Sequence, residues 1–337
     1  MRAAVLENEK FIIKEIEKPI LKNNQQGAIV KVIGCGLCGS DIVKIRDGKA
    51  KNGDVLGHEV VGNIVEINTN TKFNVGDKIV LGHHIPCFNC LYCWNENYSM
   101  CRHFKSTNIL PGGFSEYIYV SEEHLENTVF NVNLNLPDTE AAFMEPLACC
   151  IRAVKRADVK PESKNLIIGL GTIGILMGEA LTAFGHKAAG CDLKSKRVEL
   201  AKKYGFDETF VTQNNEEEAL KTMKIYAPYG FDNVFLTAGA SKTIDFALKS
   251  VRDGGKIIVF SSVKDNNGFS DNQIYYRELT VMGSYSPSPM DLEDSINLIE
   301  KGSVKVSELS TIYNLSEINQ AIEDTLTNRI MKAFIKI

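Results

Sequence analysis

The sequence predicts an α/β protein of two domains, and three features of the chain support this. A chain of 337 residues is longer than most single hydrophobic cores require. Residues 1–150 contain short apolar strands separated by turns, whereas residues 151–286 alternate strands with helices. Such alternation is typical of a doubly wound parallel sheet. We therefore expect a β-rich domain followed by a domain that binds its ligand at the carboxyl ends of parallel strands.

The first 150 residues show the pattern of β-strands. Apolar runs and alternations lie between polar breaks such as Pro19 and Asn74–Asp77, and a Pro111-Gly-Gly turn precedes another alternation that ends at Val120. Strands are expected at residues 2–6, 11–16, 28–34, 58–67 and 78–82, and between 111 and 120. They predict a compact β-barrel-like domain, followed by a helix over residues 141–154.

The second part of the chain repeats strand and helix. After an apolar strand at 165–168, a helix is expected up to Gly185, with a further strand at 186–193. A strand at 231–237, a helix at 241–252 and strands at 256–261 and 279–284 continue the alternation. A helix at 290–301 and a strand at 333–337 complete the chain.

A glycine-rich turn joins the first strand of this second domain to its helix. Gly169-Leu-Gly171-Thr-Ile-Gly174 matches G-x-G-x-x-G, which gains meaning because a strand precedes it and a helix follows. The three glycines permit a tight turn, a close approach to a pyrophosphate and close packing of helix on strand. Backbone amides near Thr172 and Ile173 are then expected to face the phosphates at the helix start.

Asp192 ends the strand that follows the glycine motif. A carboxylate there accepts hydrogen bonds from ribose hydroxyls and repels a 2′-phosphate, so the sequence favours NAD over NADP. Arg197 and two nearby lysines weaken this preference, because basic groups can receive a phosphate. The loops Thr237–Gly239 and Ser261–Val263 follow later strands, where an open α/β sheet binds its ligand. We therefore include Thr237 and Ser261 among the cofactor-binding candidates.

Four cysteines with regular spacing predict a metal site. The chain has 9 cysteines and no apparent secretion signal, which favours metal ligation over disulfides. A C-x2-C-x2-C-x7-C pattern can close a tetrahedral all-thiolate shell around one Zn²⁺ and leave no open position, so this zinc is predicted to be structural. A redox pair and an iron–sulfur cluster are the alternatives. The four residues are Cys87, Cys90, Cys93 and Cys101.

A second candidate metal site lies between Gly34 and Glu59. Cys38, His58 and Glu59 offer the thiolate, imidazole and carboxylate donors that a catalytic Zn²⁺ takes while keeping one position open. Ser40 is close enough in sequence to place a hydroxyl beside that position. Asp41 is expected to accept the second N–H of His58 and so to fix the tautomer of a metal-bound imidazole.

Composition narrows the possible partners and location. With 44% hydrophobic and 24% charged residues the chain is an ordinary globular protein, and a net charge of −4 argues against a nucleic-acid partner. The first residues lack the apolar core of a signal peptide. The most apolar helical stretch, residues 173–184, carries Glu179 and is too short to cross a bilayer. A cytoplasmic protein without a membrane partner is the expectation.

The two motifs together resemble a known family. Cys38-Gly-Ser-Asp41 followed by Gly57-His-Glu59 resembles the zinc-dependent medium-chain dehydrogenases, especially their polyol (sorbitol-type) and threonine dehydrogenase branch. The resemblance covers essentially the whole chain. It implies a GroES-like β-barrel catalytic domain at 1–150 completed by 287–337, a Rossmann NAD-binding domain at 151–286, and a homodimer or homotetramer.

The resemblance also implies a reaction. In the polyol branch, a Glu-Pro-Leu segment places its glutamate in the catalytic zinc environment. Here that segment begins at Glu145, which therefore joins the candidate ligands. Glu59 and Glu145 would each bind zinc directly or through water. The alcohol oxygen would bind zinc, Ser40 would pass its proton outward, and the hydride would move to NAD. The polyol branch has an aromatic residue a few positions after this motif, whereas residues 42–46 here contain none. Lys44, or as a second choice Arg46, then meets an anionic group such as a phosphate, or both are solvated surface cations. Tyr285 lines the pocket or has a packing role.

Three other functions share parts of this pattern. A threonine-type amino-alcohol dehydrogenase has nearly every motif, and a simple-alcohol dehydrogenase more commonly supplies a second zinc-binding cysteine. A zinc- and nucleotide-binding protein without catalysis is the alternative from another class. The complete set of candidate catalytic residues argues against that last one.

Overall fold

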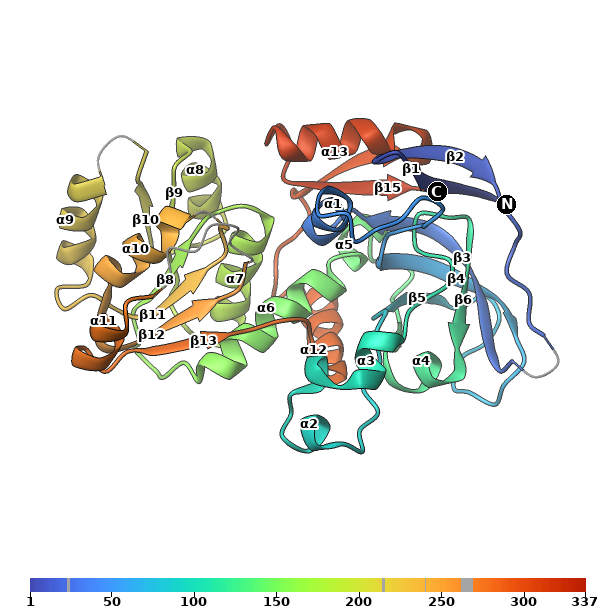
Figure 1. The fold of residues 1–337 in the computed structure, drawn as a ribbon, viewed down its shortest axis with the longest axis horizontal. Helices are drawn as coiled ribbons and strands as arrows, with labels where there is room; N and C mark the ends of the chain where they lie inside the picture. Colours follow the sequence, from blue (N-terminus) through green and yellow to red (C-terminus); the bar gives the residue numbers. More distant parts are fainter. Residues whose placement is uncertain (23–24, 214–215, 240, 262–268) are drawn as a thin grey trace. The chain divides into compact units, whose positions relative to one another are not determined.

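The chain divides into two compact units. The computed structural model describes residues 1–22, 25–213, 216–239, 241–261 and 269–337. The first unit comprises Met1–Pro146, Ser288–Gly302 and Val306–Ile337, and the second comprises Leu147–Pro287 with Ser303–Lys305. Blue N-terminal and red C-terminal strands therefore belong to the same unit (Figure 1).

The first unit is built on β-strands. Strands β1 and β2 pair antiparallel, and the others form a seven-stranded sheet in the order β14-β15-β3-β4-β5-β7, with β6 also paired to β3. Strand β15, the last of the chain, is antiparallel to the end of β3, so residues far apart in sequence meet at one place. The strands are β1 (Arg2–Glu7), β2 (Lys10–Glu15), β3 (Gly27–Gly36), β4 (Glu59–Ile67), β5 (Lys78–Leu81), β6 (Tyr117–Ser121), β7 (Val129–Asn131), β14 (Ser310–Asn314) and β15 (Lys332–Lys336).

Short helices connect these strands. One of them begins at a capping box: the Ser288 side chain accepts from the Asp291 amide and the Asp291 side chain accepts from the Ser288 amide, just before Pro289. The predicted helix over 290–301 is thereby confirmed as α12 (Pro289–Glu300). The others are α1 (Gly39–Arg46), α2 (Leu91–Trp94), η1 (Tyr98–Met100), α3 (Arg102–Ser106), α4 (Glu122–Asn127), α5 (Asp138–Ala141), η2 (Leu315–Glu317) and α13 (Ile318–Leu326). The predicted helix over 141–154 corresponds to the end of α5 and most of α6 (Met144–Ala157).

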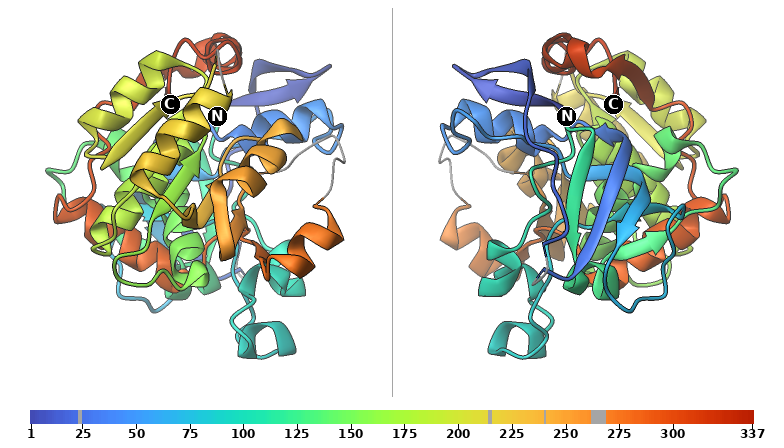
Figure 2. Two further views of the ribbon diagram at one scale, coloured as in Figure 1. Left: turned by 90° about the vertical axis from the view of Figure 1, so that its left-hand side faces the viewer. Right: turned by 90° about the vertical axis from the view of Figure 1, so that its right-hand side faces the viewer.

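The second unit is a doubly wound sheet. All its strands are parallel, in the order β10-β9-β8-β11-β12-β13, which confirms the predicted architecture. From β8 the sheet grows first to one side, through β9 and β10, and then to the other, through β11, β12 and β13, so the strand order switches between β8 and β11. Helices lie on both faces of the sheet (Figure 2). The elements are β8 (Asn165–Ile168), α7 (Thr172–Ala183), β9 (Ala189–Asp192), α8 (Ser195–Lys203), β10 (Glu208–Val211), α9 (Glu216–Tyr226), β11 (Phe231–Leu236), α10 (Ser241–Ser250), β12 (Val251–Val259), α11 (Asp271–Tyr276) and β13 (Thr280–Gly283).

Part of this alternation was not predicted from the sequence, namely α8, β10 and α9. The first turn of α9 carries Glu216, Glu217 and Glu218, and its only residues classed as buried are Ala219 and Met223. A helix with so narrow an apolar face gives a weak periodic signal. In the portion of the chain that the structure describes, no helix combines the length and apolar character needed to cross a membrane.

Candidate active site

Three neighbouring strands assemble the first candidate metal site. Cys38 follows β3 and caps α1, Glu59 opens β4, and Lys332 opens β15. Because β15, β3 and β4 are adjacent in the sheet, residues from positions 38, 59 and 332 converge at one end of it. Gly36 lies directly opposite Glu59 in the β3–β4 register. A Cβ at Gly36 would sit 1.9 Å from Glu59 Oε2, so only glycine leaves room for this carboxylate.

The side chains of Cys38, His58 and Glu59 fit a divalent metal. Their potential ligand atoms all lie within 4.8 Å of one another. Glu59 Oε2 is fully buried and makes no hydrogen bond in the described part of the chain, and the ammonium of Lys332 already lies in contact with it. Sulfur, nitrogen and oxygen donors in one cluster suit Zn²⁺, and three protein ligands leave the open position of a catalytic site.

His58 is oriented by Asp41. The Nδ1 atom of His58 lies 3.3 Å from Asp41 Oδ1, but neither atom makes a hydrogen bond among the described residues. The two side chains are therefore in contact, the hydrogen bond expected between them stays a prediction, and Nε2 of His58 is left for a metal. Burial disfavours the charged imidazole, but the negative charge of Asp41 and the proximity of Cys38 raise the pKa of His58 well above its usual value. The same negative surroundings favour a bound cation in place of that proton.

Asp41 also shapes the first turn of α1. Its Oδ2 accepts a hydrogen bond from the Cys38 amide at 3.2 Å, and the Ser40 amide donates to Cys38 Sγ at 3.4 Å. The capping box thus fixes the position of the thiolate as well as the helix start. Burial tends to raise the pKa of Asp41, but His58 and Lys44 more than offset it and hold that pKa below its usual value.

Glu59 makes a buried ion pair that the sequence analysis did not foresee. Lys332 Nζ donates to Glu59 Oε1 at 2.6 Å and also contacts Oε2. Lys332 is 8% exposed and Glu59 is 1% exposed. Burial opposes the charged ammonium, but the carboxylate of Glu59 and the charges of Cys38 and Glu145 raise the pKa of Lys332. Lys332 therefore balances the negative charge of the whole donor set.

The remaining candidates of this unit lie around the same cluster. Glu145 is buried on α6 and close enough to influence Lys332, but it does not belong to the group of three mutually close donors. Ser40 is exposed on the first turn of α1. Lys44 stands one turn after Asp41, hence on the same side of α1, and is only partly exposed.

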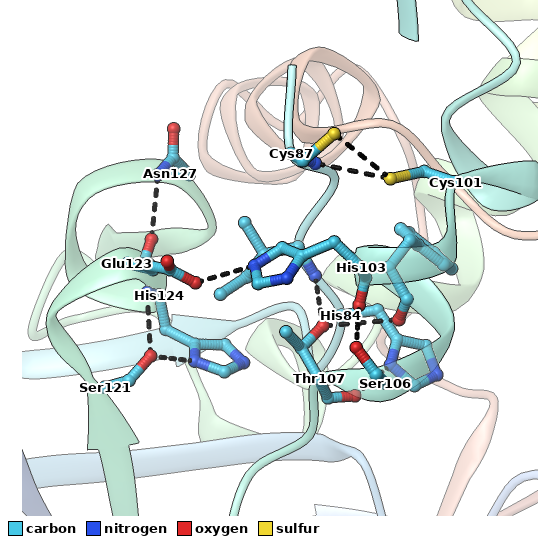
Figure 3. A network of polar contacts seen from close by, with 12 residues as sticks. His84, Cys87, Cys101, His103, Ser106, Thr107, Ser121, Glu123, His124 and Asn127 are labelled. Carbon is cyan, nitrogen blue, oxygen red and sulfur yellow. Dashed lines mark hydrogen bonds and ion pairs between the residues drawn. The ribbon is translucent and has the colours of Figure 1, made fainter. Parts of the chain in front are cut away.

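The four predicted cysteines converge, as their spacing requires. The sulfur atoms of Cys87, Cys90, Cys93 and Cys101 lie within 4.8 Å of one another, and the sulfurs of Cys87 and Cys101 are 3.5 Å apart. Figure 3 shows these two side chains pointing toward each other. Burial opposes ionisation of Cys101, but hydrogen bonds from Cys87 and from backbone amides lower its pKa to about 6. Four sulfur donors this close together fit a structural Zn²⁺.

Two adjacent histidines lie between the two candidate metal clusters. The rings of His58 and His83 have centroids 4.5 Å apart, those of His83 and His84 are 3.9 Å apart, and His84 lies 4.8 Å from Phe104 beside the cysteines. Burial, and after it the charge of His58, lower the pKa of His83 well below its usual value. The His83-His84 pair between an apolar strand and Cys87 is a signal that the sequence analysis overlooked.

The glycine loop of the second unit has the geometry of a dinucleotide site. Gly169 has a φ of +102°, which favours glycine, and a Cβ at Gly174 would come within 1.9 Å of Gly169 O. Beside Gly171 the space is open, because a Cβ there would meet only the Arg197 guanidinium, at 4.0 Å. Helix α7 starts at Thr172, so the amides of its first turn lie at this loop. The residues fit a pyrophosphate.

Asp192 is held beside that loop. Its Oδ2 accepts from the Leu170 amide at 2.8 Å and its Oδ1 from the Lys194 amide at 2.8 Å. Arg197 Nη1 lies 3.5 Å from Oδ2, so the nearest basic group is paired with the acid rather than free. Thr237 Oγ1 donates to Gly169 O at 2.6 Å, which gives this candidate a role in shaping the loop.

Two candidates receive less support from their surroundings. Ser261 has a buried hydroxyl without a partner among the described residues, while positions 262–263 of its loop lie outside them. Tyr285 is 64% exposed in the second unit, and a role for it in substrate binding stays a prediction.

Comparison with known proteins identifies both units. Residues 24–129 match the family model described as the alcohol dehydrogenase GroES-like domain, and residues 172–301 match the model described as zinc-binding dehydrogenase. These matches confirm the predicted GroES-like and Rossmann architecture.

Relatives of known name span nearly the whole chain. Sorbitol dehydrogenase of Bacillus subtilis is 30% identical, with 99% of this chain and 97% of the relative covered. D-arabitol-phosphate dehydrogenase of Enterococcus avium is 30% identical, with coverages of 91% and 89%. The crystal structure of galactitol-1-phosphate dehydrogenase from Escherichia coli is similar with a TM-score of 0.88 at 26% identity, over 100% of both chains.

Proposed function

The chain belongs to the zinc-dependent medium-chain polyol dehydrogenase family, and we propose that it transfers a hydride between a secondary alcohol of a polyol or polyol phosphate and NAD. The observation that carries this proposal is the Cys38, His58 and Glu59 cluster, whose donor atoms lie within 4.8 Å of one another. Three ligands with mixed donors define a metal site with an open position for an alcohol. The glycine loop of the second unit supplies the site for the dinucleotide.

The roles of the side chains follow from their contacts. Cys38, His58 and Glu59 would hold Zn²⁺, which would supply Lewis acidity toward an alcohol hydroxyl. Asp41 orients the His58 ring through the contact at Nδ1. Ser40, exposed on the first turn of α1, receives the hydroxyl proton and passes it to solvent.

Glu145 is proposed as an alternative or water-mediated ligand. It is buried at the start of α6, and its charge acts on Lys332 together with that of Glu59. Both carboxylates therefore stand near the same buried ammonium beside the metal candidates.

NAD is the proposed dinucleotide because Asp192 stands beside the glycine loop with its carboxylate fixed by two backbone amides. A carboxylate held there accepts bonds from the ribose hydroxyls and repels a 2′-phosphate. Arg197 is drawn to Asp192 and is therefore less available to bind such a phosphate.

Lys44 is proposed to bind the phosphate of a phosphorylated polyol. It lies one turn after Asp41 on α1, and its charge reaches both Asp41 and the neighbouring His83. Among the described residues its ammonium group makes no hydrogen bond or ion pair. A partly buried cation without a protein partner beside a metal site suits an anionic substituent on the substrate.

The direct test is NAD⁺ reduction across a panel of polyols, polyol phosphates, threonine and simple alcohols, repeated after zinc chelation. Turnover of polyols or their phosphates that is lost on chelation is expected. Turnover confined to threonine or to simple alcohols would contradict the proposed substrate class. Binding of zinc and NAD without any turnover would favour a non-catalytic protein.

A pair of variants tests the phosphate site. Lys44→Met is expected to raise KM for a polyol phosphate by about tenfold, the loss of one hydrogen bond to a charged group, and to leave the unphosphorylated polyol unchanged. Lys49→Met removes the same charge from an exposed position nearby and serves as the control. Equal effects of the two variants would show that Lys44 is an ordinary surface cation.

We also propose a homodimer or homotetramer located in the cytoplasm. Strand β13 ends the parallel sheet with one edge unpaired by any described strand, and such an edge is a ready surface for pairing with another chain. Sedimentation of the purified protein decides between one, two and four chains.

A further inference from the structure

His83 is held in place at three points of its own segment. Its carbonyl oxygen accepts a hydrogen bond from His124 Nε2 at 3.1 Å. The other nitrogen of the His124 ring lies 2.7 Å from Ser121 Oγ, and Figure 3 draws this contact between Ser121 and His124. The next residue, His84, bonds Thr107 O through Nδ1 at 2.5 Å. The amide after that is bonded to Thr107 Oγ1 at 2.9 Å. The backbone around His83 therefore has little freedom.

The His83 ring itself lies against a metal ligand. It packs between the rings of His58 and His84, and the residue is 8% exposed. Neither ring nitrogen makes a hydrogen bond with any residue that the structure describes. The two ring nitrogens of His83 are also absent from the fully buried polar atoms that lack a partner, so both border space that solvent can reach.

A purely structural role does not explain this imidazole. Burying polar atoms without partners is unfavourable, and a phenyl ring would give the same packing without that penalty. The neighbouring His84 and His124 each use their nitrogens to hold the backbone, whereas His83 uses neither. A fixed ring with an available donor and acceptor beside the metal site is what recognition of a neutral hydroxyl needs.

We propose that His83 binds the hydroxyl adjacent to the reacting carbinol and so selects vicinal diols over simple alcohols. This inference rests on the proposed function and names the part of the substrate that its active site recognises. A site built to hydrogen-bond a hydroxyl discriminates against the analogue that lacks it, because its polar group is then left unpaired.

The test compares two probe substrates that differ by one hydroxyl, 2,3-butanediol and 2-butanol, on the zinc-loaded enzyme. His83→Phe keeps the stacked ring and is expected to lower kcat/KM for the diol by about tenfold, with 2-butanol changed less than about twofold. His83→Asn offers a donor and an acceptor again and should recover part of the preference. His103→Gln removes a partly exposed histidine of α3, which is paired with Glu123, and should change turnover of neither substrate.

Calorimetric binding of the diol and the zinc content of each variant complete the experiment. Weaker diol binding by His83→Phe at unchanged zinc content supports the inference even where turnover is slow. An equal loss for both substrates, or lost zinc, would show a structural role and overturn it. A wild-type enzyme that oxidises 2-butanol but neither binds nor oxidises any polyol would overturn the proposed function and this inference together. Polyol turnover by His83→Phe with an unchanged ratio of kcat/KM for the diol over 2-butanol would overturn the inference alone.

Discussion

Replacing Lys332 by methionine removes the positive half of a buried ion pair. Glu59 is 1% exposed, and the Lys332 ammonium is its hydrogen-bond donor at 2.6 Å. Methionine has a similar shape, so the variant leaves a buried carboxylate without a partner rather than a cavity. Breaking a buried pair in this way costs about 3–5 kcal/mol. For a unit of about 190 residues, that loss lowers the melting temperature by roughly 6–20 °C.

The assay is thermal and urea denaturation of the chelator-treated protein, in which no metal can replace the lost charge. Lys332→Arg keeps the charge and is expected to lose less than about 1 kcal/mol. The double variant Lys332→Met with Glu59→Gln removes both charges and should recover most of the stability. A Lys332→Met protein as stable as wild type, or a double variant less stable than the single one, would refute the reasoning.

The other predictions concern the two metal sites, the dinucleotide and one buried acid. Cys38→Ser and His58→Ala should each abolish turnover and remove one zinc while circular dichroism stays unchanged; turnover at wild-type zinc content would contradict this. Cys90→Ala should lower the melting temperature and remove the other zinc, whereas an unaltered melting curve with both ions present would exclude a structural role. Asp192→Ala should reduce the ratio of kcat/KM for NAD⁺ over NADP⁺ by about tenfold, and an unchanged ratio would argue against the cofactor assignment. Burial raises the pKa of Glu179, so stability should fall as pH rises through that pKa; urea titrations should find this dependence in wild type and not in Glu179→Gln.

Local motifs made much of the site predictable. Cys38 and His58 lie at the two ends of a short segment, and the cysteines from Cys87 to Cys101 follow one another closely. Residue type and spacing were therefore enough to propose both candidate metal clusters. The glycine motif was recognisable because a strand precedes it and Asp192 ends the next strand. In these stretches the residues that meet in space are also close in sequence.

Long-range pairings were not predictable. Lys332 meets Glu59 across 273 residues because β15 joins the edge of β3, and no local pattern in the last strand marks it as part of the site. His83 was similarly hidden, since its importance lies in ring packing against His58 and in free nitrogens. Helix α9 was missed because acidic residues fill its first turn and little of it is buried.

The decisive measurement follows zinc content and polyol-dependent NAD⁺ reduction in the same samples, before chelation, after chelation and after zinc is returned. About two zinc ions per chain are expected in the active enzyme and about one in Cys38→Ser, with turnover lost on chelation and restored by zinc. Turnover that persists in zinc-free protein would show that the cluster of Cys38, His58 and Glu59 is not a catalytic metal site.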